Sequence, residues 1–200
     1  NSKTNAFTSI VPGKAKSAAT IICMGSSEIW MGVGSELGPI DPQIITREDG
    51  KTAIFSANTI IRSYNALFEK ATKEQGHIEP YLQQLSHYDE RAVYDYKVAV
   101  DLSSSIAAKY LKSGMMNSLS DEEINKKIAI FIDPDYTKNH GRPIYRDGAK
   151  EAGLSIKHNN DILCWDAIYE LYVRLNMFVS DVSSKCVESR DVSFCVRAPT

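Results

Sequence analysis

Short apolar runs alternate with turn residues over the first quarter of the chain. The run 6–11 is apolar and β-branched and ends at Pro12-Gly13, a pattern typical of a buried strand. The next segment, 15–24, is small and apolar and reaches Gly25 without a helix breaker, so it predicts a buried helix. Each further short run is bounded by glycine, serine or charged turn residues and predicts a strand. These runs are 28–32, 44–46 and 52–55.

From residue 56 onward the apolar residues recur at helical spacing. Ser120 and Glu123 have the spacing of a capping box, which marks the start of one helix. In the helix 89–113 the pattern directs Val93, Ala107 and Tyr110 inward. The helices predicted in this part cover 56–75, 79–85, 89–113, the segment after Ser120, 144–152 and 161–179. The sequence therefore predicts an α/β fold with a helix-rich C-terminal half and a polar tail from residue 180.

Length and charge narrow the class of protein. Two hundred residues suit one domain with an extension, and we expect a domain at 1–156 followed by a helix and polar tail at 157–200. The chain has 23 Lys plus Arg against 25 Asp plus Glu, which gives no indication of a nucleic-acid surface. No apolar run reaches transmembrane length and no signal peptide opens the chain. The first residue is Asn1, so the chain start is uninformative about targeting.

The four cysteines lack the spacing of a metal site, and no metal or organic cofactor is expected. Cys23 lies in the apolar segment 15–24 and Cys164 lies beside Trp165, so both are expected to be core thiols. Cys186 and Cys195 can pair only if the tail meets an oxidising compartment.

Ser17 lies where the predicted strand passes into the predicted helix. A hydroxyl in the first turn of a helix is close to backbone N–H groups that have no partner within the helix, at the positive end of the helix dipole. That is a suitable place for a nucleophile, because the N–H of the next residue, Ala18, can bind the oxyanion formed on attack. The residues alone leave a second interpretation open, in which Ser17 only caps a buried helix.

Two motifs in this region resemble a known family. Residues 13–20 have the pattern Gly-x-Ala-x-Ser-x-x-Thr, and residues 35–43 read Ser-Glu-Leu-Gly-Pro-Ile-Asp-Pro-Gln. Together they resemble the serine dehydrogenase proteinases, distant relatives of Clp protease and signal peptide peptidase A in the Clp/crotonase superfamily. The resemblance is firm over about residues 6–47 and weaker to about 156. It implies a Clp/crotonase-like fold and a serine endopeptidase that cleaves peptides or unfolded proteins. It also implies a homo-oligomer and a cytoplasmic location of prokaryotic type, with membrane association left open.

The family uses serine, aspartate and histidine in that chain order, which implies Ser17, Asp41 and His140 here. Asp41 lies between Pro39 and Pro42, which restrict its backbone; its other interpretation is a turn aspartate that bonds its own backbone. His140 lies in a predicted turn before Gly141. His77, His87 and His158 are weaker candidates for the base.

Two alternatives to the triad remain open from the sequence, and two further features affect the site. Signal peptide peptidases use a serine–lysine dyad, for which Lys70 and Lys73 are the candidate bases. Lys14 and Lys16 are close to Ser17 and either can favour an oxyanion. The superfamily also has a Gly-Gly turn well upstream of the nucleophile, farther than this chain reaches, so we expect either a longer parent protein or a second chain that completes the site. The second alternative to the triad is a non-catalytic Clp/crotonase-like binding or assembly module.

Overall fold

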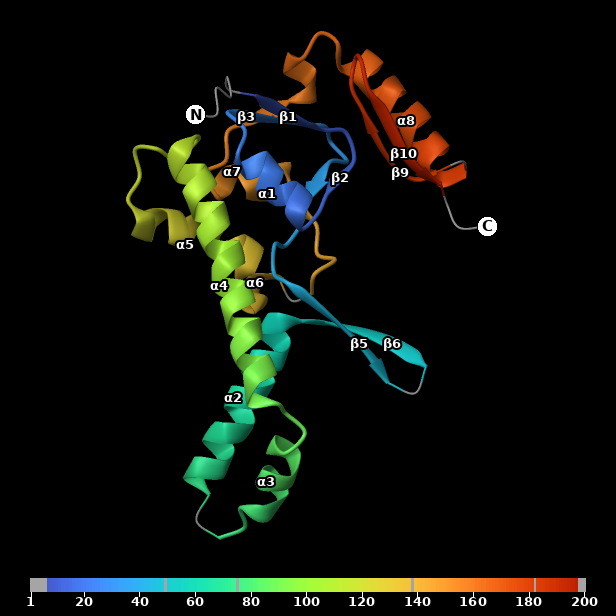
Figure 1. Cartoon of the computed structure of the whole chain (residues 1–200). Coiled ribbons are helices and arrows are strands. Elements are labelled where there is room, and N and C mark those ends of the chain that lie inside the picture. Colours follow the sequence, from blue (N-terminus) through green and yellow to red (C-terminus); the bar gives the residue numbers. More distant parts are fainter. Residues whose placement is uncertain (1–6, 49, 75, 138, 182, 198–200) are drawn as a thin grey trace. The chain divides into compact units, whose positions relative to one another are not determined.

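The computed structural model describes residues 7–48, 50–74, 76–137, 139–181 and 183–197 (Figure 1). The chain is a mixed α/β protein of helices and several small sheets, which agrees with the predicted general class. It divides into two compact units, Asn1–Ile156 and Lys157–Thr200.

The described strands of the first unit pair within three small sheets. β1 pairs in parallel with β3, β2 pairs in parallel with β4, and β4 pairs antiparallel with β7. β5 and β6 form an antiparallel hairpin. The bounds are β1 (Thr8–Val11), β2 (Lys14–Ala15), β3 (Glu28–Met31), β4 (Glu36–Leu37), β5 (Gln43–Glu48), β6 (Lys51–Ser56) and β7 (Ile144–Tyr145). The predicted strands at 6–11, 28–32, 44–46 and 52–55 are confirmed as β1, β3, β5 and β6, although Ala6 lies outside the described residues.

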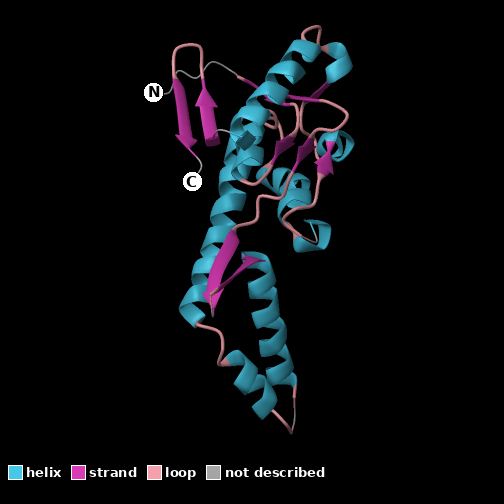
Figure 2. Cartoon of the chain, turned by 90° about the vertical axis from the view of Figure 1, so that its right-hand side faces the viewer, coloured by secondary structure: helices cyan, strands magenta, loops and turns pink. Residues whose placement is uncertain are grey.

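The helices of the first unit pack around α4, which contacts α1, α2 and α5 (Figure 2). The predicted capping box at the start of α5 is confirmed, since Ser120 Oγ accepts from the Glu123 N–H and Glu123 Oε2 accepts from the Ser120 N–H. The bounds are α1 (Ala18–Met24), α2 (Ala57–Lys73), α3 (Glu79–Leu85), α4 (Glu90–Ser113), α5 (Asp121–Ile132), α6 (Pro134–Thr137) and α7 (Arg146–Glu151).

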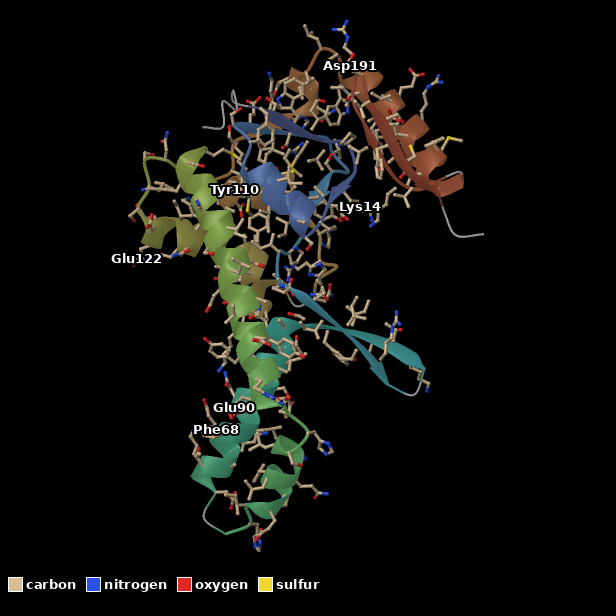
Figure 3. The ribbon with its side chains drawn as sticks, in the orientation of Figure 1. Lys14, Phe68, Glu90, Tyr110, Glu122 and Asp191 are labelled. Carbon is tan, nitrogen blue, oxygen red and sulfur yellow. The ribbon has the colours of Figure 1, made fainter. Side chains whose placement is uncertain are left out.

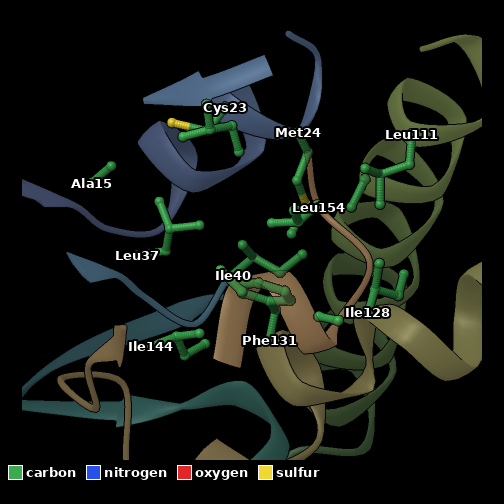
Figure 4. Close-up of a cluster of buried hydrophobic side chains, with 14 of the residues drawn as sticks. Ala15, Cys23, Met24, Leu37, Ile40, Leu111, Ile128, Phe131, Ile144 and Leu154 are labelled. Atoms are coloured by element: carbon green, nitrogen blue, oxygen red, sulfur yellow. The ribbon is translucent and has the colours of Figure 1, made fainter. Parts of the chain in front are cut away.

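One hydrophobic core joins the early strands to the later helices (Figure 4). Met24 of α1, Leu37 of β4, Leu111 of α4 and Phe131 of α5 are all fully buried in it. Burial of each such side chain stabilises the fold by roughly 1.5–3 kcal/mol. The core therefore fixes α1 and β4, from the first quarter of the chain, against α5, which precedes the candidate histidine.

Two predicted helices of the first unit begin later than expected because their first residues belong to strands. Ala15 belongs to β2, where it pairs with Leu37, so α1 begins at Ala18 and not at residue 15. Ile144 and Tyr145 pair with β4, so the helix predicted at 144–152 begins at Arg146. In both places a two-residue strand pairs with a segment distant in sequence, and local periodicity carries no sign of such pairing.

Tyr110, expected to point inward, is 47% exposed (Figure 3). Its ring lies beside Gly25, the C-cap of α1, where a Cβ would be 3.7 Å from the ring. Because α1 ends there, the Tyr110 ring covers the end of the helix at the surface instead of entering the core.

The second unit contains a helix and a hairpin. After β8 (Ile156–His158) and a 3-10 turn (Asn159–Asp161), α8 spans Trp165–Asp181, so the helix predicted at 161–179 begins later. Cys164 is exposed and not a core thiol, because it lies on the turn before α8. The tail expected to be polar forms a hairpin of β9 (Ser183–Glu188) and β10 (Ser193–Arg197). Among the described residues, none of the helices combines the length and apolar character needed to cross a bilayer.

Candidate active site

Ser17 occupies a strained turn between β2 and α1. Its φ and ψ are 51° and −119°, and it is the one non-glycine residue with positive φ in the described ranges. Backbone strain of this kind costs roughly 1–3 kcal/mol and is concentrated at functional sites. A strained serine between a strand and a helix is also how α/β-hydrolases expose their nucleophile. The Ser17 side chain is half-buried and makes no hydrogen bond to any residue that the structure describes.

The backbone around Ser17 leaves one N–H group available. The Ser17 N–H donates to the Pro39 C=O at 3.1 Å, and the Ala19 N–H donates to the Lys16 C=O at 3.0 Å. The Ala18 N–H, between them, donates to no acceptor within the described part of the chain, and Ala18 is exposed. It is therefore free to bind an oxygen atom of a ligand beside the Ser17 hydroxyl.

Asp41 and His140 form a direct side-chain pair. Asp41 Oδ1 and His140 Nδ1 are 2.8 Å apart, although the residues are 99 positions apart in sequence. The Asp41 side chain is 4% exposed and that of His140 is 25% exposed. Gln43 Nε2 donates to the other carboxylate oxygen, Asp41 Oδ2, at 2.9 Å. The carboxylate thus receives two hydrogen bonds, and the imidazole remains partly exposed to solvent.

The segment Leu37–Gln43, which we call the central segment, is fixed along most of its length. The Thr20 hydroxyl of α1 accepts from the Gly38 N–H at 3.1 Å and donates to the Ala15 C=O at 2.7 Å. A Cβ at Gly38 would lie 2.2 Å from Lys16 Cδ, so only glycine fits this position without displacing that side chain. The central segment therefore lies against the strand–turn–helix that carries Ser17.

Asp41 itself lies between two anchored peptides. The Ile40 N–H donates to the Phe131 C=O of α5 at 2.9 Å, and the Pro42 C=O accepts from the Ala57 N–H of α2 at 2.9 Å. These bonds orient the Asp41 carboxylate from both sides, so Asp41 is not a turn residue bonded to its own backbone in the described structure.

The loop of His140 is fixed on the side that follows the histidine. The Arg142 guanidinium donates to the Tyr136 C=O at 2.5 Å, and β7 joins the edge of β4. Lys16 Nζ lies 3.4 Å from the Arg142 C=O. The residue before Ser17 therefore contacts the chain two residues after His140.

Glu36 was not predicted as a site residue, and Lys16 was expected only as a charge that can favour an oxyanion. Lys16 Nζ lies 3.1 Å from Glu36 Oε1 and 3.2 Å from the Leu37 C=O. Burial acts to raise the pKa of Glu36, but the hydrogen bond and charge of Lys16, with the charge of Lys14, outweigh it and the pKa is lowered. Lys16 is thus a structural link between the Ser17 turn, the central segment and the His140 loop. The sequence offered one signal, the glycine at position 38 that makes room for it.

The lysines expected as alternative bases lie elsewhere. α2 begins beside Pro42, and Lys70 and Lys73 lie about 20 and 24 Å farther along the helix, at ~1.5 Å per residue. Lys73 pairs with Glu69 at 3.3 Å. The structure thus does not bring either lysine to Ser17 within one chain, because both lie in the last turn of α2. His87 lines a cavity described below, and His158 Nδ1 accepts from the Asn160 N–H.

A cavity of about 650 Å³ lies between the β5–β6 hairpin, α2 and α4. Thr46, Phe55, His87 and Tyr96 are among its lining residues, whereas Ser17, Asp41 and His140 are not. Within the described ranges one group of potential metal ligands is found, Cys186, Glu188 and Cys195 of the second unit.

Comparisons with known protein families, curated proteins and solved structures find no match for the chain. The resemblance to serine dehydrogenase proteinases therefore rests on sequence motifs, chiefly those of residues 13–20 and 35–43.

Replacement of Lys16 by Met should lower the free energy of unfolding by roughly 1–3 kcal/mol at neutral pH. The reason is that the nearly buried carboxylate of Glu36 loses its closest partner. Because the pKa of Glu36 is lowered on folding, its ionisation stabilises the fold above its ordinary value of 4.5, and this contribution disappears as the pH falls through the lower folded value. Urea unfolding of both proteins at pH 7 and in acid measures the difference, which should shrink in acid. Lys14→Met is the control and should cost less than about 1 kcal/mol, since Lys14 is largely exposed. Equal losses in the two variants would contradict the structural role of Lys16.

Replacement of Ser17 by Gly should raise the free energy of unfolding by roughly 1 kcal/mol, because glycine adopts this backbone conformation without strain. Ser17→Ala keeps the strain and removes a hydroxyl that has no hydrogen bond, so its stability should stay within about 0.5 kcal/mol of the wild type. Urea denaturation of the three proteins tests the pair. A Gly variant less stable than the Ala variant would show that the turn is unstrained.

Proposed function

We propose that the chain carries the active site of a serine endopeptidase of the Clp/crotonase type, similar to the serine dehydrogenase proteinases. Its catalytic residues are Ser17, His140 and Asp41, and its substrates are peptides or unfolded proteins. The observation that carries the proposal is the 2.8 Å contact between His140 and the nearly buried Asp41. The motif resemblance had already implied that both residues belong to one catalytic triad. The strained backbone of Ser17 gives independent support.

Each residue has one role in this mechanism. Asp41 accepts from His140 Nδ1–H, which fixes the imidazole tautomer and stabilises the cation that forms. His140 Nε2 then takes the proton of the Ser17 hydroxyl as Oγ attacks the peptide carbonyl. The same nitrogen returns the proton to the leaving amine. In the second half of the reaction His140 takes a proton from water, which attacks the acyl-enzyme, and returns a proton to the Ser17 oxygen as it leaves.

The tetrahedral intermediate needs donors for its oxyanion. The Ala18 N–H supplies one, since it is free and directly follows the nucleophile. The superfamily resemblance implies a second donor from a Gly-Gly turn, and a second subunit of a homo-oligomer is one source that can supply it.

The Ser17 hydroxyl and the His140 ring form no hydrogen bond within the described structure. Such bonds are often long or absent in unliganded enzymes and tighten in the substrate complex. No described residue holds the Ser17 side chain in place, and the mechanism requires its contact with His140 to form when substrate binds. The non-catalytic module is the alternative that applies if this contact never forms.

Ser17→Ala should abolish hydrolysis of an unfolded protein such as casein. A fluorophosphonate probe should label the wild type and leave the Ala variant unlabelled, because the probe reacts only with an activated serine hydroxyl. Ser63→Ala, an exposed serine of α2, is the matched control and should keep both activities. Labelling that persists in Ser17→Ala at equal stoichiometry would exclude Ser17 as the nucleophile.

His140→Ala should lower kcat/KM by several orders of magnitude. Asp41→Asn should lower it by up to about 10⁴-fold, because the amide favours the His140 tautomer whose Nε2 cannot accept a proton. Lys70→Ala and Lys73→Ala should retain kcat/KM within about twofold of the wild type, because both lysines lie far along α2. Steady-state assays of the four variants distinguish the triad from the dyad. Near wild-type activity in His140→Ala together with an inactive lysine variant would reverse the assignment.

A further inference from the structure

Two cysteines of the second unit face each other across the C-terminal hairpin. Cys186 of β9 and Cys195 of β10 are register partners in the antiparallel pair. Their sulfur atoms are 2.8 Å apart, and both are free thiols. A disulfide needs about 2.0 Å between its sulfur atoms, so the pair is within about 0.8 Å of bonding geometry. Directly opposite positions also satisfy the Cα separation that a disulfide requires.

The two thiols differ in their surroundings. Cys195 is exposed, whereas Cys186 is half-buried and lines a cavity of about 310 Å³ with Tyr172, Leu175 and Val179 of α8. Glu188 Oε1 accepts from the Cys186 thiol at 3.3 Å and from the Ser193 hydroxyl at 2.6 Å. The shared hydrogen bond with Cys195, with burial and the Glu188 carboxylate, raises the pKa of Cys186 to about 12. The exposed thiol is therefore the one placed to meet an oxidant from solution.

We propose that Cys186 and Cys195 are a reversible thiol–disulfide site that closes the β9–β10 hairpin. The oxidant is a small-molecule disulfide of the glutathione type. The Cys195 thiolate attacks one sulfur of that disulfide, and the other half leaves as a thiolate with the electron pair. Cys186 loses its proton to solvent and attacks the Cys195 sulfur, which releases the second small thiol. The protein loses two electrons and two protons, and one small disulfide is reduced to two thiols.

A metal ion fits the same atoms less well. Two thiolates that bind one tetrahedral Zn²⁺ at about 2.3 Å each lie about 3.8 Å apart, which is wider than the observed 2.8 Å. The described residues supply one further ligand oxygen, from Glu188, and so leave a tetrahedral site incomplete. The geometry therefore favours a bond between the sulfurs.

Closure of the site should stabilise the hairpin. A two-stranded hairpin is marginal by itself, and this one is supported in its own unit by α8. The cysteines are nine positions apart in sequence, and closing a loop of that size should increase hydrogen-exchange protection of the β9 and β10 amides by about 100-fold if they exchange through hairpin opening.

The test uses the full chain with Cys164→Ser, which removes the other exposed thiol. Incubation with oxidised glutathione, followed by alkylation and peptide mass mapping, should show an intramolecular Cys186–Cys195 link that dithiothreitol reverses. Cys186→Ser and Cys195→Ser should each stop at a mixed glutathione adduct. Glu188→Gln should still form the link, since the carboxylate takes no part in the bond.

Hydrogen exchange of the reduced and oxidised forms gives the second measurement. Unchanged protection of β9 and β10 in the linked protein would overturn the proposed closure of the hairpin. If the oxidised Cys164→Ser protein contained mixed glutathione adducts but no Cys186–Cys195 link, the proposed disulfide would be excluded. Binding of one Zn²⁺ per reduced chain that blocks oxidation and is lost in Glu188→Gln would replace the disulfide site by a metal site.

Discussion

The arrangement of the first unit depends on the hydrogen bonds made by the central segment, Leu37–Gln43. This segment has little regular secondary structure of its own, yet its backbone contacts α1, α2, α5 and the Ser17 turn. A buried irregular segment must find partners for its backbone polar groups elsewhere, because each unpaired group costs about 1–3 kcal/mol. Here those partners come from elements distant in sequence. The requirement for backbone pairing therefore also determines where Asp41 lies.

The strain at Ser17 and the bonds of the central segment are parts of one arrangement. The Ser17 N–H reaches the Pro39 C=O only because the turn between β2 and α1 is sharp. The cost of that backbone is offset by burial of Met24 of α1 and Leu37 of β4 in the core. Lys16 completes the connection by reaching the β4 edge and the His140 loop. A strained serine, a buried carboxylate and a histidine loop are thus supported by the same few contacts.

The sequence predicted those features that depend on neighbouring residues. The capping box of Ser120 and the strands β1, β3, β5 and β6 follow from local chemistry, whereas the helix predicted at 15–24 begins only at Ala18. It did not predict β2, β4 and β7, since two-residue strands have no period to detect, and their partners are far along the chain. Cys164 was misplaced for a related reason, because its exposure depends on where α8 begins. The Asp41–His140 pair came from motif resemblance, which periodicity alone could not supply.

The burial of Asp41 is the strongest physical argument that the pair has more than a structural role. Removal of a carboxylate from water costs several kcal/mol unless partners compensate, and apolar replacements for buried pairs are often as stable or more so. Asp41 receives bonds from Gln43 and from a histidine whose ring remains partly open to solvent. If the carboxylate served packing alone, its partner would be expected to be buried as well. Instead Nδ1 faces the carboxylate, and Nε2 has no hydrogen-bond partner among the described residues. With Nδ1–H donating to the carboxylate, Nε2 is an acceptor, and this is the tautomer that a general base needs.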